Sequence, residues 1–342
     1  YSSAASDVYK RQEVVSARTY VTAGTSNGER WLAEPRRLAA ELPLSTSTQE
    51  CCCAYNMLKL TRQLYTWTAD PRYFDYYERA LLNHRLGTIE PETGATQYYL
   101  SLTPGAWKTF NSEYSSFWCC TGTGIEEFSK LNDSIYYHDA DGLYVNLFIA
   151  SELVWPEKGL RLRQATKFPE RPRTQLAITA QKPVRMSIRI RVPEWLSGAA
   201  VKINGRALEA LASPGSYLTI SRVWRTGDRI EMDLPMSLRI EKMPDDPSLQ
   251  AILYGPLVLA GELGSEGLTK DLIFGTNRVP LDRTPKIEVP SFKAAGDDPN
   301  SWIKPVAGKP LAFRATGQVK DVSLVPLNRI FGQRYSVYWK VT

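Results

Sequence analysis

Hydrophobic side chains recur every three or four residues along the first part of the chain, as in amphipathic helices. One such run covers 54–65 and stops before the Asp-Pro pair at 70–71, and a second covers 74–84. A third helix is predicted from the glycine-rich segment at 121–124 through 135, and 97–102 reads as a short extended piece. Three helices cannot bury their apolar faces as a bundle of their own. We therefore expect them to belong to a larger helical domain.

The period changes to two after the Asp-Ala-Asp-Gly segment at 139–142, which we interpret as a hairpin turn. The alternation predicts short strands at 143–150, 160–168, 174–180, 184–192, 201–205, 217–220 and 228–234. Many short strands separated by Gly, Pro or Asn turns are typical of a β-sandwich. Two more apolar strands flank Gly255-Pro256, and a last strand is predicted over 334–342.

These patterns predict a multidomain α + β chain with four segments. Residues 1–12 show neither period, and we expect an unstructured or foreign leader there. A helical domain is expected over 13–140 and a β-sandwich over 141–262. The remainder, 263–342, is rich in Pro, Gly and Asp and is expected to be a loop-rich β module with the final strand.

Composition and charge exclude several classes of protein. Of the 342 residues, 43% are hydrophobic, which is enough to build cores and excludes wholesale disorder. The net charge of +6 is spread along the chain rather than gathered in the basic stripe of a nucleic-acid-binding protein. Arg185, Arg189 and Arg191 alternate on one predicted strand, which we interpret as a solvated sheet face. No apolar run approaches the ~20 residues of a membrane span.

All five cysteines lie in two clusters, Cys51–Cys53 and Cys119–Cys120. An odd number of adjacent cysteines makes a poor disulfide framework, because neighbours cannot easily bridge each other. Two clusters could instead converge on a metal ion, for which Zn²⁺ is the usual occupant, and Glu50 adds a carboxylate beside the first cluster. The alternative is that the thiols are buried as small hydrophobic groups.

Two segments closely resemble the β-L-arabinofuranosidase family, glycoside hydrolase families 127 and 146. They are ECCCAYNML at 50–58 and SFWCCTGTGIE at 116–126, and the WCCTGTG form is closer to family 146. The resemblance covers about residues 20–260. It implies the C-terminal part of an (α/α)6 barrel followed by β-sandwich domains, with the upstream part of the barrel absent from this chain.

The resemblance also implies a retaining glycosidase with a cysteine nucleophile held on zinc. Four residues correspond to the zinc ligands, namely Glu50, Cys52, Cys119 and Cys120. Cys119 corresponds to the nucleophile and Glu29 to the general acid/base, whereas the other two cysteines correspond to no ligand. The assignment is chemically reasonable because zinc coordination deprotonates a thiol, and a thiolate is a strong nucleophile.

The implied substrate is β-L-arabinofuranose attached to an oligosaccharide or to a glycoprotein glycan, which indicates a periplasmic or extracellular enzyme. Trp118 beside the nucleophile and His84 on an apolar helix side are candidate contacts to the sugar, although a core position is the alternative for His84. Two other functions remain open. One is a noncatalytic carbohydrate-binding protein with a structural zinc, and the other is a redox protein that uses the vicinal thiols.

Overall fold

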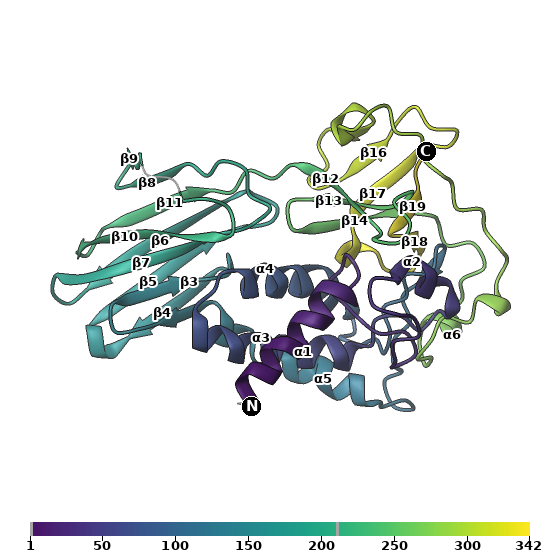
Figure 1. The fold of residues 1–342 in the computed structure, drawn as a ribbon, viewed down its shortest axis with the longest axis horizontal. Coiled ribbons are helices and arrows are strands. Elements are labelled where there is room, and N and C mark those ends of the chain that lie inside the picture. Colours follow the sequence, from purple (N-terminus) through teal and green to yellow (C-terminus); the bar gives the residue numbers. More distant parts are fainter. Residues whose placement is uncertain (1–2, 210–211) are drawn as a thin grey trace. The chain divides into compact units, whose positions relative to one another are not determined.

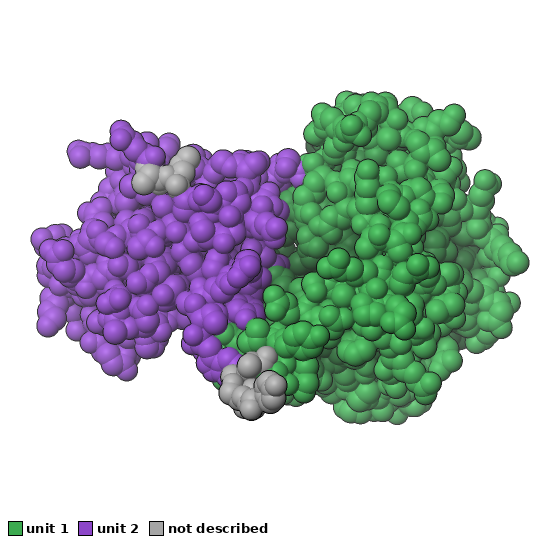
Figure 2. Space-filling model, viewed as in Figure 1, with its two compact units in different colours: residues 1–64, 76–128, 238–342 green, residues 65–75, 129–237 purple. Residues whose placement is uncertain are grey.

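The computed structural model describes residues 3–209 and 212–342, which form two compact units (Figures 1 and 2). The first unit takes in the chain up to residue 64 together with 76–128 and 238–342, and the second consists of 65–75 and 129–237. The chain is a helical part followed by several β-sheets, which confirms the predicted fold class.

The long helices lie where the helical period predicts them. The α-helices are α1 (Ser3–Ala17), α2 (Leu38–Glu41), α3 (Cys51–Thr68), α4 (Arg72–Arg79), α5 (Cys119–Phe128) and α6 (Lys270–Ile273). Shorter helical turns are η1 (Leu42–Leu44), η2 (Ala80–Arg85), η3 (Leu86–Thr88), η4 (Leu131–Ser134), η5 (Pro156–Lys158), η6 (Leu281–Arg283), η7 (Pro299–Ser301) and η8 (Leu327–Arg329). Among the described residues, every helix is too short or too polar to span a bilayer.

The expected leader over 1–12 is wrong for its described part, because helix α1 begins at Ser3. The helical period is weak there because a charged side chain occupies the packed face. Arg11 is buried, donates from Nε to the Thr61 hydroxyl at 3.1 Å, and lies over the Tyr76 ring. A pattern search for apolar side chains does not detect such a helix.

Helix α5 begins earlier and ends earlier than its sequence indicates. The glycine-rich segment 121–124 lies inside the helix rather than at its entry, and the chain leaves the helix at Phe128. Gly124 is required by close packing, since a Cβ atom there would lie 2.8 Å from Cγ2 of Thr96. Gly124 therefore allows close approach of α5 to the loop that carries Thr96.

The second unit is the expected β-sandwich, with two sheets around one apolar core. Its strands are β2 (Tyr136–His138), β3 (Gly142–Val145), β4 (Ser151–Trp155), β5 (Leu160–Thr166), β6 (Arg173–Ala180), β7 (Val184–Val192), β8 (Val201–Ile203), β9 (Arg206–Ala207), β10 (Ser216–Trp224) and β11 (Arg229–Asp233). The sheet orders are β10-β7-β3-β2 and β4-β5-β6-β11-β8-β9. Strands β2 and β3 form the predicted hairpin around 139–142.

The sandwich ends at residue 237, so its expected C-terminal boundary at 262 is wrong. The following strands belong to a third, nine-stranded sheet in the first unit: β1 (Ala106–Trp107), β12 (Leu238–Lys242), β13 (Leu249–Tyr254), β14 (Leu257–Glu262), β15 (Ile303–Pro305), β16 (Phe313–Ala315), β17 (Val322–Pro326), β18 (Arg334–Ser336) and β19 (Tyr338–Lys340). Strand β14 pairs with β13, β17 and β18, and β13 also pairs with β19. Strand pairing between distant parts of the chain sets the boundary of the sandwich, and such pairing leaves no mark in the hydrophobic periodicity.

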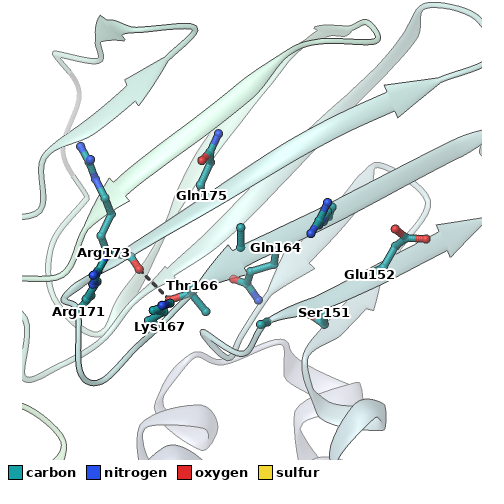
Figure 3. A pocket seen from close by; sticks show the side chains of 11 residues that line it. Ser151, Glu152, Gln164, Thr166, Lys167, Arg171, Arg173 and Gln175 are labelled. Atoms are coloured by element: carbon teal, nitrogen blue, oxygen red, sulfur yellow. Dashed lines mark hydrogen bonds between the residues drawn. The ribbon is translucent and has the colours of Figure 1, made fainter.

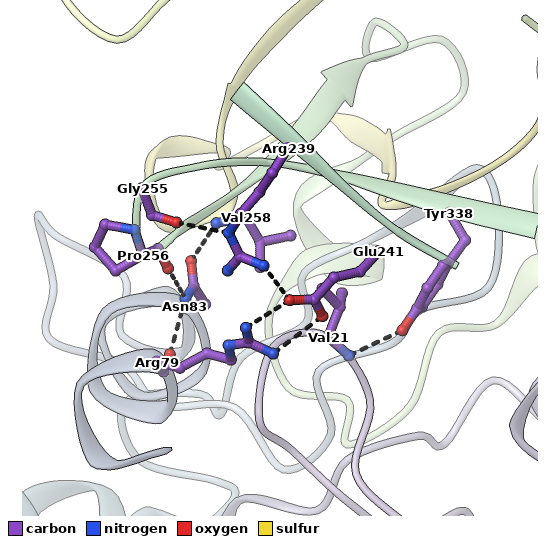
Figure 4. Close-up of polar contacts among 9 residues, drawn as sticks. All are labelled: Val21, Arg79, Asn83, Arg239, Glu241, Gly255, Pro256, Val258 and Tyr338. Atoms are coloured by element: carbon purple, nitrogen blue, oxygen red, sulfur yellow. Dashed lines mark hydrogen bonds and ion pairs between the residues drawn. The ribbon is translucent and has the colours of Figure 1, made fainter. Parts of the chain in front are cut away.

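Polar side chains join this sheet to the helices within the first unit (Figure 4). Glu241 on β12 accepts hydrogen bonds from the guanidinium of Arg79, at 2.5 and 3.0 Å, and also pairs with Arg239. Asn83 donates to the carbonyl of Pro256 at 2.8 Å and accepts from the amide of Val258 at 2.6 Å. These contacts hold the end of α4 and the following π-helical turn against the tip of the β13–β14 hairpin.

Candidate metal centre and active site

Four side chains with metal-binding atoms converge at the N-terminal ends of two helices in the first unit. Glu50 immediately precedes α3, and Cys52 lies in its first turn. Cys119 and Cys120 open α5. One ligand atom from each residue lies within 4.8 Å of the other three. The structure thus brings together the four residues expected as ligands, and they could hold a metal ion.

Backbone pairing sets the position of the first pair of ligands. Glu50 forms an isolated antiparallel bridge with Tyr99, and the amide of Cys51 donates to the carbonyl of Tyr98 at 2.9 Å. The Glu50 amide donates to the Ser26 hydroxyl at 3.1 Å. The predicted extended segment and the loop that carries Glu29 are therefore both fastened to the start of α3.

The thiol distances form a compact cluster around Cys120. Its Sγ lies 3.2 Å from Sγ of Cys52, 3.9 Å from Sγ of Cys119 and 3.8 Å from Oε1 of Glu50. Cys120 and Glu50 are buried and Cys52 is half-buried, whereas Cys119 is exposed. The cluster is consequently closed on one side and open to solvent at Cys119.

The thiols do not share the same protonation preference. A hydrogen bond from the Cys120 thiol lowers the pKa of Cys52 to about 6, and the same bond raises the pKa of Cys120. Burial raises the pKa of Cys119. The hydrogen bond between the two sulfur atoms therefore favours a thiolate on Cys52 over one on Cys120.

The two remaining cysteines lie outside the four-residue group. Cys53 donates from Sγ to Oε2 of Glu50 at 2.9 Å and thus holds a carboxylate of the candidate centre. Cys51 is buried, and burial raises its thiol pKa to about 11. The sequence pattern assigns no role to Cys53, because a hydrogen bond to a metal-binding carboxylate leaves no recognisable residue spacing.

A hydroxyl group connects the candidate acid/base to the candidate nucleophile. Oε1 of Glu29 accepts a short hydrogen bond from the Tyr98 hydroxyl and a second one, at 3.3 Å, from Tyr99. The Tyr98 oxygen also lies 3.5 Å from Sγ of Cys119. Burial and the contact with Glu29 raise the pKa of Tyr98, so its hydroxyl stays protonated. The aromatic composition of this segment was visible in the sequence, but its contact with Glu29 was not.

The backbone around these groups is strained. Four non-glycine residues have a positive φ, namely Ala23, Ser26, Glu29 and Gln49. Such conformations cost free energy and gather at functional sites. Gly24 is needed in the same loop, since a Cβ atom there would lie 2.6 Å from Cδ2 of His84.

His84 is a core residue rather than an open contact to a sugar. Its side chain is 0% exposed, and Nε2 lies 3.2 Å from the carbonyl oxygen of Gln49. Burial lowers its pKa to about 3, which keeps the imidazole neutral. The loop carrying Gly24 covers the ring, which favours the core position for His84, and a contact between His84 and substrate stays a prediction.

Trp118 is the aromatic residue next to Cys119 and is half-buried. Its ring meets the Tyr98 ring edge-on, with centroids 6.1 Å apart. The Trp118 amide donates to the Thr121 hydroxyl at 3.2 Å, which fixes the first turn of α5. Its place beside the candidate nucleophile agrees with a role in sugar binding, and that role stays a prediction.

Comparisons with known proteins cover almost the whole chain. Residues 2–133 match the model of the β-L-arabinofuranosidase GH127 catalytic domain, and residues 142–236 match that of the GH127 middle domain. Residues 239–341 match a domain of unknown function. A search of curated protein sequences finds no match. The matched models are those of family 127, and the closer resemblance to family 146 stays a prediction.

Solved structures share the fold at low sequence identity. A protein described as a glycoside hydrolase superposes with a TM-score of 0.73 at 20% identity, over 97% of this chain and 61% of its own. A GH127 β-L-arabinofuranosidase from Geobacillus stearothermophilus T6 gives 0.72 at 17% identity, over 97% and 55%. A further GH127 β-arabinofuranosidase gives 0.70 at 20%, with the same coverage. The chain thus spans little more than half the length of these proteins, and it belongs to the GH127 β-L-arabinofuranosidase family.

Proposed function

We propose that this chain carries the catalytic centre of a retaining glycoside hydrolase that releases β-L-arabinofuranose, with Cys119 as nucleophile and Glu29 as acid/base. The observation that carries the proposal is the Tyr98 hydroxyl, which contacts both groups beside a four-residue metal-binding cluster. A fold alone does not define an activity, so the argument rests on this local arrangement.

The donor set fits Zn²⁺. Three thiols and one carboxylate are typical zinc ligands, and Zn–S bonds of about 2.3 Å place tetrahedral sulfur ligands about 3.8 Å apart. The Cys119–Cys120 separation of 3.9 Å has this value, and the Cys52–Cys120 separation of 3.2 Å needs only a small opening. When bound, zinc would keep the thiols deprotonated at neutral pH and fix the direction of the Cys119 sulfur.

The separation of Glu29 and Cys119 suits a double displacement. Both contact one hydroxyl, so they lie no more than two hydrogen-bond lengths apart, at most about 6 Å. Retaining glycosidases hold their two carboxyl groups about 5–5.5 Å apart, because the nucleophile and the proton donor address one glycosidic bond. The geometry therefore favours retention over inversion, which needs room for a water molecule between substrate and base.

The residues would act in two steps. Sγ of Cys119 attacks the anomeric carbon and forms a C–S bond while the glycosidic C–O bond breaks, and Glu29 donates its proton to the departing oxygen. Glu29, now a carboxylate, takes a proton from water, whose oxygen displaces Sγ and releases the sugar. Two inversions give net retention. Tyr98 holds Glu29 by its hydroxyl throughout.

Exposure of Cys119 supports an enzyme over a noncatalytic carbohydrate-binding protein with a structural metal. Structural zinc sites are closed by their ligands, whereas a catalytic site leaves a reacting position accessible. Here one thiol of the cluster is exposed, while Glu50 and Cys120 are buried. Vicinal thiols without C-x-x-C spacing give the redox alternative no comparable support.

The proposed substrate is a terminal β-L-arabinofuranose on an oligosaccharide or a glycoprotein glycan, by analogy with the family. Substrates of this class lie outside the cytoplasm, so we place the enzyme in the periplasm or outside the cell. Because the chain spans 55–61% of its solved relatives, we expect this length of chain to be catalytically weak on its own.

Trapping of the nucleophile tests the proposal. An epoxide with the β-L-arabinofuranose configuration should label the chain once, and peptide mapping by mass spectrometry should place the adduct on Cys119. The glucose-configured epoxide is the control reagent, and Cys119→Ser is the control variant. Labelling that falls equally on exposed and buried cysteines, or that ignores the sugar configuration, would contradict the assignment.

A further inference from the structure

The β-sandwich unit contains a cavity of about 600 Å³ over strands β4, β5 and β6 (Figure 3). Most of the residues that line it are of polar types, and they include four cations, Arg163, Lys167, Arg171 and Arg173, together with the amide of Gln175. It contains none of the residues of the metal centre. We refer to it below as the basic cavity.

Ion pairing on this face is uneven. Arg161 pairs with Glu152 at 2.5 Å, and Arg173 pairs with Asp233 at 2.9 Å, so two of the arginines in the region have carboxylate partners. For the other three cations that line the basic cavity, Arg163, Lys167 and Arg171, the structure shows no side-chain hydrogen bond or ion pair to any residue in the described ranges. On a solvated surface with balanced charges, cations without a carboxylate partner would be scattered. Here they line the same cavity.

The excess positive charge therefore lies in the cavity itself. Glu152 is the carboxylate that lines it, and Arg161 offsets that charge. Arg163, within β5, lies directly across from Glu152 of β4. Lys167 and Arg171 follow the C-terminal end of β5. Cations at two places along one cavity suit a ligand with several negative charges at intervals, rather than a single anion.

We propose that the basic cavity binds an oligosaccharide that bears carboxylate groups. Arginine guanidinium groups match carboxylates in a bidentate geometry, and the Gln175 amide can bond sugar hydroxyls. The aromatic platforms that bind neutral sugars by stacking are absent from the lining residues. The site would anchor an acidic glycan on the sandwich, independently of the chemistry proposed for Cys119.

Calorimetric titration of the whole chain with tetragalacturonate, an oligomer of a carboxylated sugar, tests this inference. The variant Arg163→Gln/Lys167→Gln/Arg171→Gln should bind at least about tenfold more weakly. The matched control is Lys182→Gln/Arg185→Gln/Arg206→Gln, which removes the same charge from exposed positions of the same unit outside the cavity and should bind as the parent does. Thermal unfolding of both variants verifies that each is folded.

Salt and competing ligands complete the test. Raising the salt from about 0.01 M to about 1 M shortens the screening length from about 30 Å to about 3 Å and should abolish binding. A neutral tetrasaccharide should not bind. The inference is overturned if both variants lose affinity equally, or if the neutral tetrasaccharide binds as well as tetragalacturonate. It is also overturned if tetragalacturonate does not bind, or if duplex DNA competes as well as tetragalacturonate does. No turnover is measured, so failure of the proposed catalysis leaves the result interpretable.

Discussion

At the scale of single residues, the account rests on side chains that hold the reacting groups rather than on the reacting groups alone. Motif resemblance identified Glu29, Glu50 and the cysteines. It did not identify Tyr98, whose hydrogen bond to Glu29 joins residues 69 positions apart, or Cys53, whose thiol reaches the Glu50 carboxylate three residues earlier only once α3 has formed. Hydrogen bonds of this kind depend on where the backbone places two segments, which local sequence does not encode.

Tyr98→Phe should lower kcat/KM by about 10- to 100-fold, because Glu29 loses its short hydrogen bond and the contact with Cys119 disappears. Metal content should stay unchanged, since Tyr98 is outside the four-residue group. The measurement is hydrolysis of an aryl β-L-arabinofuranoside. Tyr99→Phe removes the longer hydrogen bond to the same carboxylate and should have the smaller effect; the reverse order would contradict the role given to Tyr98.

Cys53→Ala should weaken metal affinity by about tenfold or more, because Glu50 loses the donor that orients its carboxylate. Competition with a chromogenic chelator measures the dissociation constant without any assay of activity. Cys53→Ser keeps a donor at the same position and should restore most of the affinity. If alanine and serine behave alike, the hydrogen bond has no part in holding the metal ligand.

His84 should make the free energy of unfolding depend on pH. Its folded pKa of about 3 lies below the ordinary value of 6.5, so the unfolded chain binds more protons between these values. The stabilisation is present above about pH 6.5 and is lost as the pH falls towards 3. Denaturant titrations of the parent and His84→Gln should converge as the medium becomes acidic. A constant difference across that range would refute the buried neutral histidine.

At the scale of elements, periodicity located α3, the hairpin at 139–142 and most strands of the sandwich, because each buries one regular face. Periodicity failed where a charged side chain is buried, or where a strand pairs with a strand that is distant along the chain. Helix α1 buries Arg11, and strand β7 carries a fully buried Arg191 together with an exposed Arg185 and a half-buried Arg189. Strands β13 and β14 have a continuous apolar pattern that fits any buried sheet, so their partners decide to which sheet they belong.

Strand β7 gives a direct test of this point, since the expected solvated face is wrong at Arg191. That side chain is 0% exposed and pairs with Asp75 at 2.6 Å, both within the second unit. Arg191→Met should cost about 3–5 kcal/mol of unfolding free energy, because it leaves a carboxylate without its main partner. Arg185→Met, at an exposed position of the same strand, should change stability by less than about 0.5 kcal/mol. Chemical denaturation compares them.

At the scale of the whole molecule, the four-residue metal-binding group and the proposed acid/base Glu29 all lie in the first unit. The family models divide the chain in the same order, with the catalytic match ending at residue 133 and the middle domain beginning at 142. The chemistry and the proposed binding of an acidic glycan therefore belong to different units. Substitutions in the basic cavity should leave metal content unchanged.

The most direct test of the central claim is the metal content of the purified, reduced chain, measured by mass spectrometry of the elements. The account predicts about one zinc per folded chain, lost in Cys52→Ser/Cys120→Ser and retained in Cys51→Ser, whose thiol lies outside the cluster. A folded chain without zinc, or one whose zinc survives loss of both cluster thiols, would contradict the metal-thiolate centre.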